Sequence, residues 1–341
     1  MRAAIFNPYL DTLGGGERYS MAVAQALLLK GYTVNLEWKD PTIKKKLEDR
    51  FGIDLSDMQV VPDIKKGSGY DFCFWVSDGS IPTLSARKNI LHFQVPFHGV
   101  NGKTLLNRMK LFRISKIVCN SIFTKKVIDR EYGVNSIVIY PPVATDQFIP
   151  KKKENLILFV GRFSQLKQAK NQDFLIKAFK SFSKKMNTPW KLILAGGSEI
   201  GVGDYVEKLR TLVGDSKIEI IENPSFKEIC NLYGRAKIFW SAVGYGVNED
   251  KEPEKVEHFG ISVVEAMSAG AVPVVFKAGG YKGIIQDNEN GILWNRLSDL
   301  CSKTKELISN KKVMSYLTDK AREASEKYSY ERFQKDFLNL L

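Results

Sequence analysis

The stretch VEHFGISVVEAMSAGAVPVVF, residues 256–276, decides how this sequence is expected to fold. Its apolar residues predict a helix over residues 261–269 and, after Gly270, a buried strand over residues 272–276. Glu265 lies inside this apolar run, where a carboxylate without a partner costs several kcal/mol or takes up a proton. Glu257 precedes it by eight residues, across Gly260. We therefore expect the two carboxylates to belong to a binding site.

Outward from this stretch, short apolar runs alternate with amphipathic stretches, which is the pattern of parallel sheets covered by helices. The pattern restarts after Pro141-Pro142, and 341 residues are enough for two domains with separate cores. We predict an α/β protein with two doubly wound, Rossmann-like domains over residues 1–148 and 149–325, followed by a C-terminal helix over residues 326–341. Open sheets of this kind bind ligands at the carboxyl ends of their strands, so the chemistry is expected in a central cleft that the two domains face.

The predicted strands follow from the apolar runs alone. They are residues 3–6, 33–36, 72–75, 90–93, 116–119 and 136–139 in the first half, and residues 156–160, 191–195, 217–221, 237–240, 272–276 and 291–293 in the second.

Composition narrows the class of protein. A net charge of +13 favours a polyanionic partner, which leaves nucleic acid, an anionic membrane and phosphorylated small molecules open. No stretch is apolar enough to span a bilayer, and the apolar start is too short for a signal peptide, so a cytoplasmic protein is expected. The cysteines are too far apart to indicate a zinc site or a disulfide framework; they are Cys73, Cys119, Cys230 and Cys301.

The loop Gly14-Gly15-Gly16 joins a predicted strand to a predicted helix over residues 16–29. Bare backbone N–H groups at a helix start favour an anion. Tyr19 stands where the dinucleotide fingerprint requires its third glycine, although Glu37 near the end of the second strand would suit NAD. We interpret the loop as a contact for phosphate or sugar, with an NAD site and a purely structural turn as alternatives.

The second domain repeats this arrangement. Gly161-Arg162 follows the strand over residues 156–160, and Lys170 opens a helix. Two cations beside a helix amino terminus favour the same negative charge, so they predict a diphosphate site. Lys167 is a competing candidate for Lys170, and Arg162 could instead pair only with a surface acid.

The opening stretch supplies the remaining groups. Gly260 exposes its N–H where the helix over residues 261–269 begins, which predicts another anion site. The two oxygens of Glu265 can accept both hydroxyls of a ribose diol, and Glu257 can accept from the hydroxyls of a sugar. In the alternative interpretation, Glu265 is buried against Arg or Lys and Glu257 is a solvated loop residue.

Together these motifs resemble the retaining glycosyltransferases of family 4, which have the GT-B fold. The resemblance covers nearly the whole chain and includes GGGER, NSIFTKKVIDREYG leading to VIYPPV, GRF with KNQDFLIKAF, EHFGISVVE, AMSAGAVPVV and the pair Gly279-Gly280. The segments ILHFQVPF and EHFGISVVEAM are most similar to mannosyltransferases that extend lipid-linked oligosaccharides. In this fold the last helix returns to the first domain.

The resemblance implies a role for each candidate. Glu265 would bind the nucleotide ribose and Glu257 the donor sugar, while His92 would face the transferred sugar. The loop between Arg162 and Lys170 is longer than the commonest family pattern, which leaves Lys167 or Lys170 open as the partner of Arg162 at the diphosphate. The backbone contacts with the donor would come from Gly15, Gly16, Phe259, Gly260 and Ile261.

The predicted activity is transfer of a hexose from a GDP- or UDP-sugar to a glycan or lipid-linked acceptor, with retention of anomeric configuration. We expect neither a metal ion nor a further cofactor, because the cations stabilise the leaving diphosphate and the chain has no Asp-x-Asp motif. The acidic segment at residues 248–254 is expected to be mobile and solvated. The alternatives are a sugar-nucleotide epimerase of similar architecture and a basic nucleic-acid-binding or scaffold protein.

Positive charge is concentrated at residues 101–116 and in the lysine run at residues 44–46, both in the first domain. This pattern favours docking on anionic lipid, so the protein is expected in the cytoplasm and at the cytoplasmic membrane face.

Overall fold

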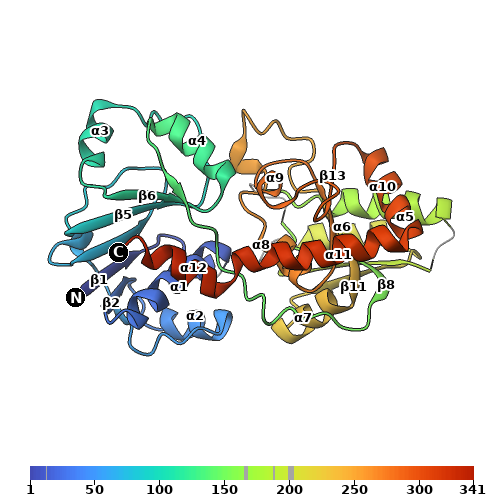
Figure 1. Cartoon of the computed structure of the whole chain (residues 1–341), viewed down its shortest axis with the longest axis horizontal. Helices are drawn as coiled ribbons and strands as arrows, with labels where there is room; N and C mark the ends of the chain where they lie inside the picture. Colours follow the sequence, from blue (N-terminus) through green and yellow to red (C-terminus); the bar gives the residue numbers. More distant parts are fainter. Residues whose placement is uncertain (13, 165–167, 187–188, 199–202) are drawn as a thin grey trace. The chain divides into compact units, whose positions relative to one another are not determined.

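Two parallel sheets organise the chain, and each belongs to a separate unit (Figure 1). The computed structural model describes residues 1–12, 14–164, 168–186, 189–198 and 203–341. Unit 1 comprises Met1–Pro142 with Tyr330–Leu341, and unit 2 comprises Val143–Ser329. The predicted α/β class, with two doubly wound sheets, is confirmed.

The sheet of unit 1 has seven parallel strands in the order β3-β2-β1-β4-β5-β6-β7. Its central strands are buried on both faces, as expected of a sheet covered by helices. The strands are β1 (Arg2–Phe6), β2 (Thr33–Glu37), β3 (Gln59–Val61), β4 (Phe72–Val76), β5 (Lys88–Phe93), β6 (Lys116–Cys119) and β7 (Ile137–Val138).

Helices cover both faces of this sheet, with α3 and α4 on one side and α1, α2 and α12 on the other (Figure 1). The last helix belongs to unit 1 because its aromatic rings enter the core: Phe333 lies 5.0 Å from Tyr19, and Phe337 lies 6.1 Å from Phe72, between ring centroids. The helices are α1 (Gly15–Leu29), α2 (Ile43–Phe51), α3 (Leu105–Leu111), α4 (Ile122–Tyr132) and α12 (Tyr330–Leu338).

The sheet of unit 2 has six parallel strands in the order β10-β9-β8-β11-β12-β13. The apolar run of β8 lies in the middle of this sheet, where the sequence placed the first strand of a second domain. The strands are β8 (Glu154–Val160), β9 (Lys191–Gly196), β10 (Ile218–Glu222), β11 (Ala236–Ser241), β12 (Val272–Phe276) and β13 (Ile292–Trp294).

The helices of unit 2 lie between and after these strands. The helix predicted from the opening stretch is α8, and it leads into β12 as expected. The helices are α5 (Gln172–Met186), α6 (Gly203–Val213), α7 (Phe226–Arg235), α8 (Ile261–Ser268), α9 (Tyr281–Ile284), α10 (Leu297–Ser309) and α11 (Lys311–Ser325).

The boundaries between the units differ by a few residues from the predicted ones at 148/149 and 325/326. The division falls after Pro142 because the next residues pack within unit 2. Val143 N donates to Tyr328 O, and Ser268 Oγ donates to Thr145 O. The first of these bonds also keeps the turn that precedes α12 in unit 2.

The strand order reverses direction in each sheet, between β1 and β4 in unit 1 and between β8 and β11 in unit 2. In open parallel sheets, ligands bind at the carboxyl ends of the strands beside such a reversal. The loops that follow these strands contain both glycine motifs singled out from the sequence.

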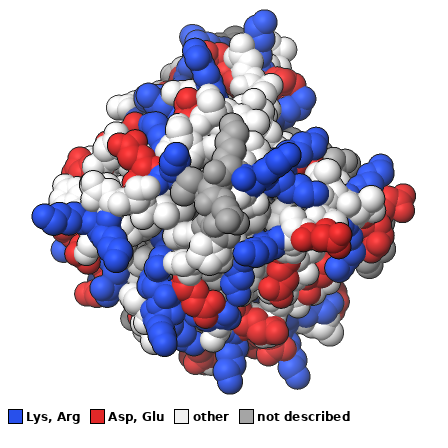
Figure 2. Space-filling model, turned by 90° about the vertical axis from the view of Figure 1, so that its right-hand side faces the viewer, with Lys and Arg blue, Asp and Glu red and all other residues white. Residues whose placement is uncertain are grey.

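The surface charge is mixed on the face of the molecule that Figure 2 shows. On the face shown in Figure 2, Lys and Arg side chains are interspersed with Asp and Glu rather than gathered in one patch. None of the helices in the described part of the chain combines the length and apolar composition that crossing a bilayer requires.

Candidate functional site

Lys170 and Glu257 form an ion pair between two loops that follow strands of the unit 2 sheet. Lys170 Nζ lies 3.1 Å from Glu257 Oε2, and the two side chains are 14% and 16% exposed. Lys170 Nζ also donates to Gln168 Oε1 at 2.6 Å, and Gln168 Nε2 donates to Val256 O. Glu257 is therefore not the solvated loop residue of the alternative interpretation. The contact joins the loop after β8 to the loop before α8.

Glycines let the backbone come close at this point. A Cβ at Gly161 would lie 2.8 Å from Phe159 Cζ and, at 3.7 Å, in ordinary contact with Lys170 Cγ, so the lysine stem lies next to this glycine. A Cβ at Gly196 would lie only 2.0 Å from Gly161 O. Arg162 follows with an exposed side chain, and its carbonyl accepts from Gln172 Nε2 at 2.8 Å. The backbone of Gly161 and Arg162 thus packs against the segment that carries Lys170.

The loop that carries Glu257 packs on a second glycine pair. Gly280 N donates to Glu257 O at 2.6 Å, and a Cβ at Gly279 would come within 2.2 Å of that oxygen. Gly260, the residue before α8, has a φ of +120°, and a Cβ there would lie 2.8 Å from Tyr281 Cε1. Only glycine fits these close approaches without displacing backbone or a buried ring.

The amino terminus of α8 lies next to this loop. The first N–H groups of a helix have no acceptors within the helix, and the helix dipole makes this end positive. The amides of Phe259, Gly260 and Ile261 are at this end, while the Phe259 ring is buried and lies 5.3 Å from Tyr328. The backbone here can bind an anion close to Glu257.

Glu265 is buried, as its apolar neighbours predicted, with 8% of its surface exposed. Tyr233 of α7, which is fully buried, donates its hydroxyl to Glu265 Oε2 at 2.9 Å. The sequence analysis did not identify this partner. A phenol donates one hydrogen bond to the carboxylate and brings no positive charge to it.

Tyr281 is a buried residue that packs against the loop carrying Glu257. Its hydroxyl lies 2.8 Å from Ser241 Oγ, and its side chain has no appreciable exposure. Burial, and then the charge of Glu257, raises the pKa of Tyr281 well above its ordinary value. Its hydroxyl is therefore neutral near pH 7.

The acidic segment at residues 248–254 is not a freely solvated loop. Glu249 accepts from Gly279 N at 2.7 Å and forms an ion pair with Lys282. Glu252 pairs with Lys255, which directly follows the segment. Glu249 therefore ties the segment to the glycine pair, while Asn248, Asp250, Lys251 and Glu254 are exposed, as expected of a solvated loop.

In unit 1 the glycine loop leads into α1, as predicted. Glu17 caps this end from within: its Oε2 accepts from Gly14 N at 2.7 Å and from Thr12 Oγ1 at 2.8 Å. Gly15 is exposed, and a Cβ at Gly16 would lie 2.0 Å from Gln94 Oε1. The helix start is therefore covered on one side by the side chain of Gln94.

Gln94 and Asn120 are polar residues at this edge that the sequence analysis missed. They follow the carboxyl ends of β5 and β6, and Asn120 Nδ2 donates to Gln94 O at 2.9 Å. Among the described residues, Gln94 Oε1 and Asn120 Oδ1 have no hydrogen-bond partner although both atoms are buried. The signal that could have found them is their position directly after two predicted strands.

His92 does not lie at the edge. It belongs to β5, has no exposed surface, and stacks on Tyr19 and Phe74 with ring centroids 4.1 Å and 5.4 Å away. Burial lowers the pKa of His92 to about 3, so the imidazole is neutral. This position contradicts the predicted contact with a transferred sugar, because a side chain without exposed surface offers a ligand no face.

Lys167 and Glu37 are the two remaining candidates from the sequence. Lys167, the competitor of Lys170, lies outside the described residues. Glu37, which would suit NAD, accepts from Ile64 N at 3.0 Å and so holds the loop after β3.

These features define an α/β protein with two Rossmann-like units and a site suited to an anionic ligand that carries hydroxyl groups. A family model described as glycosyl transferases group 1 matches residues 144–324, which is more than half of the chain. The chain belongs to this family. The resemblance found in the sequence is confirmed at this level.

Two relatives illustrate the similarity. An uncharacterised glycosyltransferase of Methanocaldococcus jannaschii is 27% identical over 74% of this chain and 69% of its own length. A GDP-Man:Man(3)GlcNAc(2)-PP-Dol alpha-1,2-mannosyltransferase of Dictyostelium discoideum is 26% identical over 76% of this chain. The aligned part spans 57% of that second relative.

A solved structure supports the fold. HepE of Anabaena, crystallised in complex with UDP and glucose, superposes with a TM-score of 0.75 at 17% identity, covering 99% of this chain and 98% of HepE. The two parallel-sheet α/β units are those of the GT-B fold, as predicted.

Proposed function

We propose that this protein is a retaining hexosyltransferase that moves a sugar, with mannose favoured, from a GDP- or UDP-sugar to a glycan or lipid-linked acceptor without a metal ion. Membership of the glycosyltransferase family supports the class of reaction. The name of the Dictyostelium relative, which uses GDP-mannose and a lipid-linked glycan, supports mannose and the acceptor class. The predicted location in the cytoplasm belongs to the same proposal.

The observation that carries this proposal is the Lys170–Glu257 ion pair beside the amino terminus of α8. A nucleotide sugar combines a diphosphate with a hydroxyl-rich ring, and this pair offers one group for each. Lys170 and Arg162 bind the diphosphate, together with the amides of Gly260 and Ile261. Glu257 accepts from hydroxyls of the sugar while its contact with Lys170 fixes its position.

Glu265 binds the ribose in this proposal. Its carboxylate accepts from the ribose hydroxyls, while the Tyr233 hydroxyl keeps it oriented. Burial strengthens these bonds, because a carboxylate taken out of water gains more from each donor that reaches it.

The reaction breaks the bond between the anomeric carbon and the diphosphate oxygen. The acceptor oxygen attacks from the face that the diphosphate leaves, and the acceptor proton passes to the departing phosphate oxygen. Negative charge develops on the diphosphate, where Arg162, Lys170 and the α8 amides stabilise it; each such group typically contributes about a hundredfold in rate. These cations take the role that a divalent ion has in other transferases.

The glycine loop of unit 1 has a separate place in the proposal. The exposed backbone of Gly15, with Gly16 behind it, supplies N–H donors at the positive end of α1 for an anionic part of the substrate. Glu17 already occupies Gly14 N, which directs the ligand to the later amides.

The test uses nucleotide sugars without an acceptor. Incubation with a panel of UDP- and GDP-sugars should release free nucleotide slowly from one of them. Glu265→Gln should raise the KM about tenfold or more, because it loses charged acceptors for the ribose. The matched control is Glu254→Gln, an exposed carboxylate in the same loop as Glu257, which should leave release unchanged.

Other products would overturn the proposal. A nucleotide sugar whose ring configuration changes while it stays attached to the nucleotide would indicate an epimerase. Inversion at the anomeric carbon of a transferred sugar, read by proton NMR, would overturn retention alone. Tight binding to DNA or RNA without affinity for any nucleotide sugar would remove the transferase altogether.

A further inference from the structure

Helix α3 is unusual because none of its residues is buried. Leu111 packs partly against the core of unit 1, but four other large apolar side chains, counting Phe112 at the end of the helix, are between 60% and 90% exposed. At the helical spacing of 3.6 residues per turn, these side chains occupy one arc of about 120° around the axis. They are Leu105, Leu106, Met109 and Phe112.

Cations frame this apolar arc, which we call the α3 face. Arg108 and Lys110 project on either side of it at helical spacing. The methylene groups of these side chains can therefore lie along the acyl region of a membrane while their charges stay in water. Residues 99–116 contain five Lys or Arg and no Asp or Glu. An apolar face flanked by these cations is complementary to an anionic lipid surface and not to a basic one.

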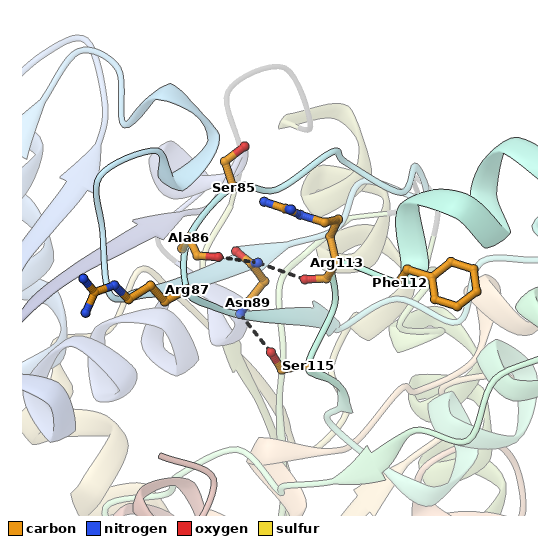
Figure 3. A pocket seen from close by; sticks show the side chains of 7 residues that line it. All are labelled: Ser85, Ala86, Arg87, Asn89, Phe112, Arg113 and Ser115. Carbon is orange, nitrogen blue, oxygen red and sulfur yellow. Dashed lines mark hydrogen bonds between the residues drawn. The ribbon is translucent and has the colours of Figure 1, made fainter.

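A polar hollow adjoins the α3 face. It has a volume of about 470 Å³ and lies at the amino ends of β5 and β6. Phe112, the residue that ends α3, also lines it. Figure 3 shows Arg113 reaching toward Ser85 across it, while the Phe112 ring points away from these side chains. Arg113 Nε donates to Leu84 O at 3.2 Å, which holds the guanidinium in place.

Asn89 ties the walls of this hollow together. Its Nδ2 donates to Ala86 O at 3.0 Å and to Arg113 O at 2.8 Å (Figure 3). Asn89 is 2% exposed, and its Oδ1 has no partner among the described residues. Both amide hydrogens of Asn89 are used to join the two walls, which holds the backbone of Arg113 in place beside the hollow. The group that a headgroup phosphate would meet there is the guanidinium of Arg113.

We propose that the α3 face and the adjoining hollow dock this protein on an anionic phospholipid bilayer. The apolar side chains of α3 enter the boundary of the acyl region, and the hollow receives a headgroup phosphate at Arg113. The α3 face and the hollow thus name the residues that contact the membrane. None of these residues takes part in the transfer reaction. The docking proposal stands or falls independently of the proposed donor and acceptor.

The test measures sedimentation with vesicles of phosphatidylcholine, with and without phosphatidylglycerol, at low and high salt. The protein should bind only the anionic vesicles, and high salt should weaken the binding. Leu106→Gln combined with Phe112→Gln should reduce binding about tenfold or more, since both side chains leave the acyl boundary. Arg108→Gln with Lys110→Gln should reduce it about fivefold for each charge removed. Arg113→Gln should have an effect comparable with the loss of one of these charges.

Matched controls come from α11, which also carries exposed apolar and basic residues. Val313→Gln with Tyr316→Gln, and Lys311→Gln with Lys312→Gln, should leave vesicle binding unchanged. Nucleotide release without vesicles should stay the same in the α3 variants, which separates a failure of docking from a failure of the enzyme.

Two results would overturn the docking proposal. The first is absence of binding to anionic vesicles, or binding that the α11 variants reduce as much as the α3 variants. The second is a stable dimer in analytical ultracentrifugation that the Leu106→Gln, Phe112→Gln variant dissociates, since a second copy of the chain would then cover the α3 face.

Discussion

The carboxyl edges of the two sheets share a topology but differ in chemistry. In unit 2, the loops carry Lys170 paired with Glu257, and Glu265 held by Tyr233. In unit 1, the loops after β5 and β6 carry two neutral amides, Gln94 and Asn120, whose oxygens lack partners among the described residues. Charged groups suit the diphosphate and polar ring of a nucleotide sugar. Gln94 and Asn120 add hydrogen-bonding groups without charge.

Both edges use glycine where a side chain would collide with a functional group. A Cβ at Gly279 would meet the backbone oxygen of Glu257 at 2.2 Å, whereas a Cβ at Gly16 would meet the side chain of Gln94 at 2.0 Å. Backbone cannot move aside as a flexible side chain can. A Gly→Ala substitution should therefore lower the stability of unit 2 at Gly279. At Gly16 it should disturb only the position of the Gln94 side chain in unit 1.

The largest effect is expected from Lys170→Met. Loss of this cation should lower the rate of nucleotide release about a hundredfold or more, because the leaving diphosphate loses a positive partner. Release assays with the variant and with Lys177→Met, an exposed lysine of α5 that pairs with Asp173, provide the comparison.

The partner of Lys170 complicates this result in a way that can be measured. Without Lys170, Glu257 keeps a half-buried charge that has lost its ion pair, so urea unfolding should also show reduced stability. Lys170→Met combined with Glu257→Gln should recover that stability but no activity. Recovery of activity in the double variant would show that Lys170 acts only by neutralising Glu257.

Gly279→Ala should have the next largest effect. The residue has a φ of +54°, and its new Cβ would press on the backbone of Glu257, so we expect a loss of about 2–4 kcal/mol in the free energy of unfolding. Gly246→Ala is a matched control: its φ is +81°, but a Cβ there has no neighbour within 4 Å. It should cost about 1 kcal/mol for the conformation alone. Equal losses in the two variants would argue against a packed loop around Glu257.

Gly16→Ala should disturb unit 1 without unfolding it. The new methyl group displaces the side chain of Gln94, so acceptor-dependent transfer should fall several-fold while thermal stability stays within about 1 kcal/mol of the original. The Gln94→Ala variant leaves room for this methyl group, and the combined variant should be no worse than Gln94→Ala alone. Additive losses would mean that Gly16 contacts the substrate independently of Gln94.

The fold was predictable because its strands are continuous apolar runs and its helices have clear ends. Ser121 caps α4 by accepting from Thr124 N, as its position before an amphipathic stretch indicated. Strand β3 was missed because Gln59–Val61 is a short edge strand without a buried residue, so neither length nor hydrophobicity marks it.

The candidate site was predictable in its residues but not in its pairings. Lys170 and Glu257 are 87 positions apart, so no local pattern links them. Tyr233 lies on an amphipathic helix, where an aromatic residue indicates only a core position. In β5 both faces are buried, so periodicity could not tell His92, inside the strand, from Gln94, just past its end.

The smallest effect at neutral pH is expected from His92→Phe. If the edge of unit 1 works through Gln94 and Asn120 rather than through His92, a phenyl ring stacked on Tyr19 and Phe74 should leave transfer unchanged.

The His92→Phe substitution should instead change how the stability of the protein responds to acid. The folded-state pKa of His92 is about 3 and the unfolded value is near 6.5, so between these pH values only the unfolded chain takes up the proton. Stability is therefore fully present above pH 6.5 and falls as the pH drops toward 3, by about 1.4 kcal/mol per pH unit. Urea unfolding of both proteins from neutral to acidic pH should show this contribution in the original chain and its absence in the variant. A variant that unfolds normally but has lost transfer activity would return His92 to the site and remove the contrast between the two edges.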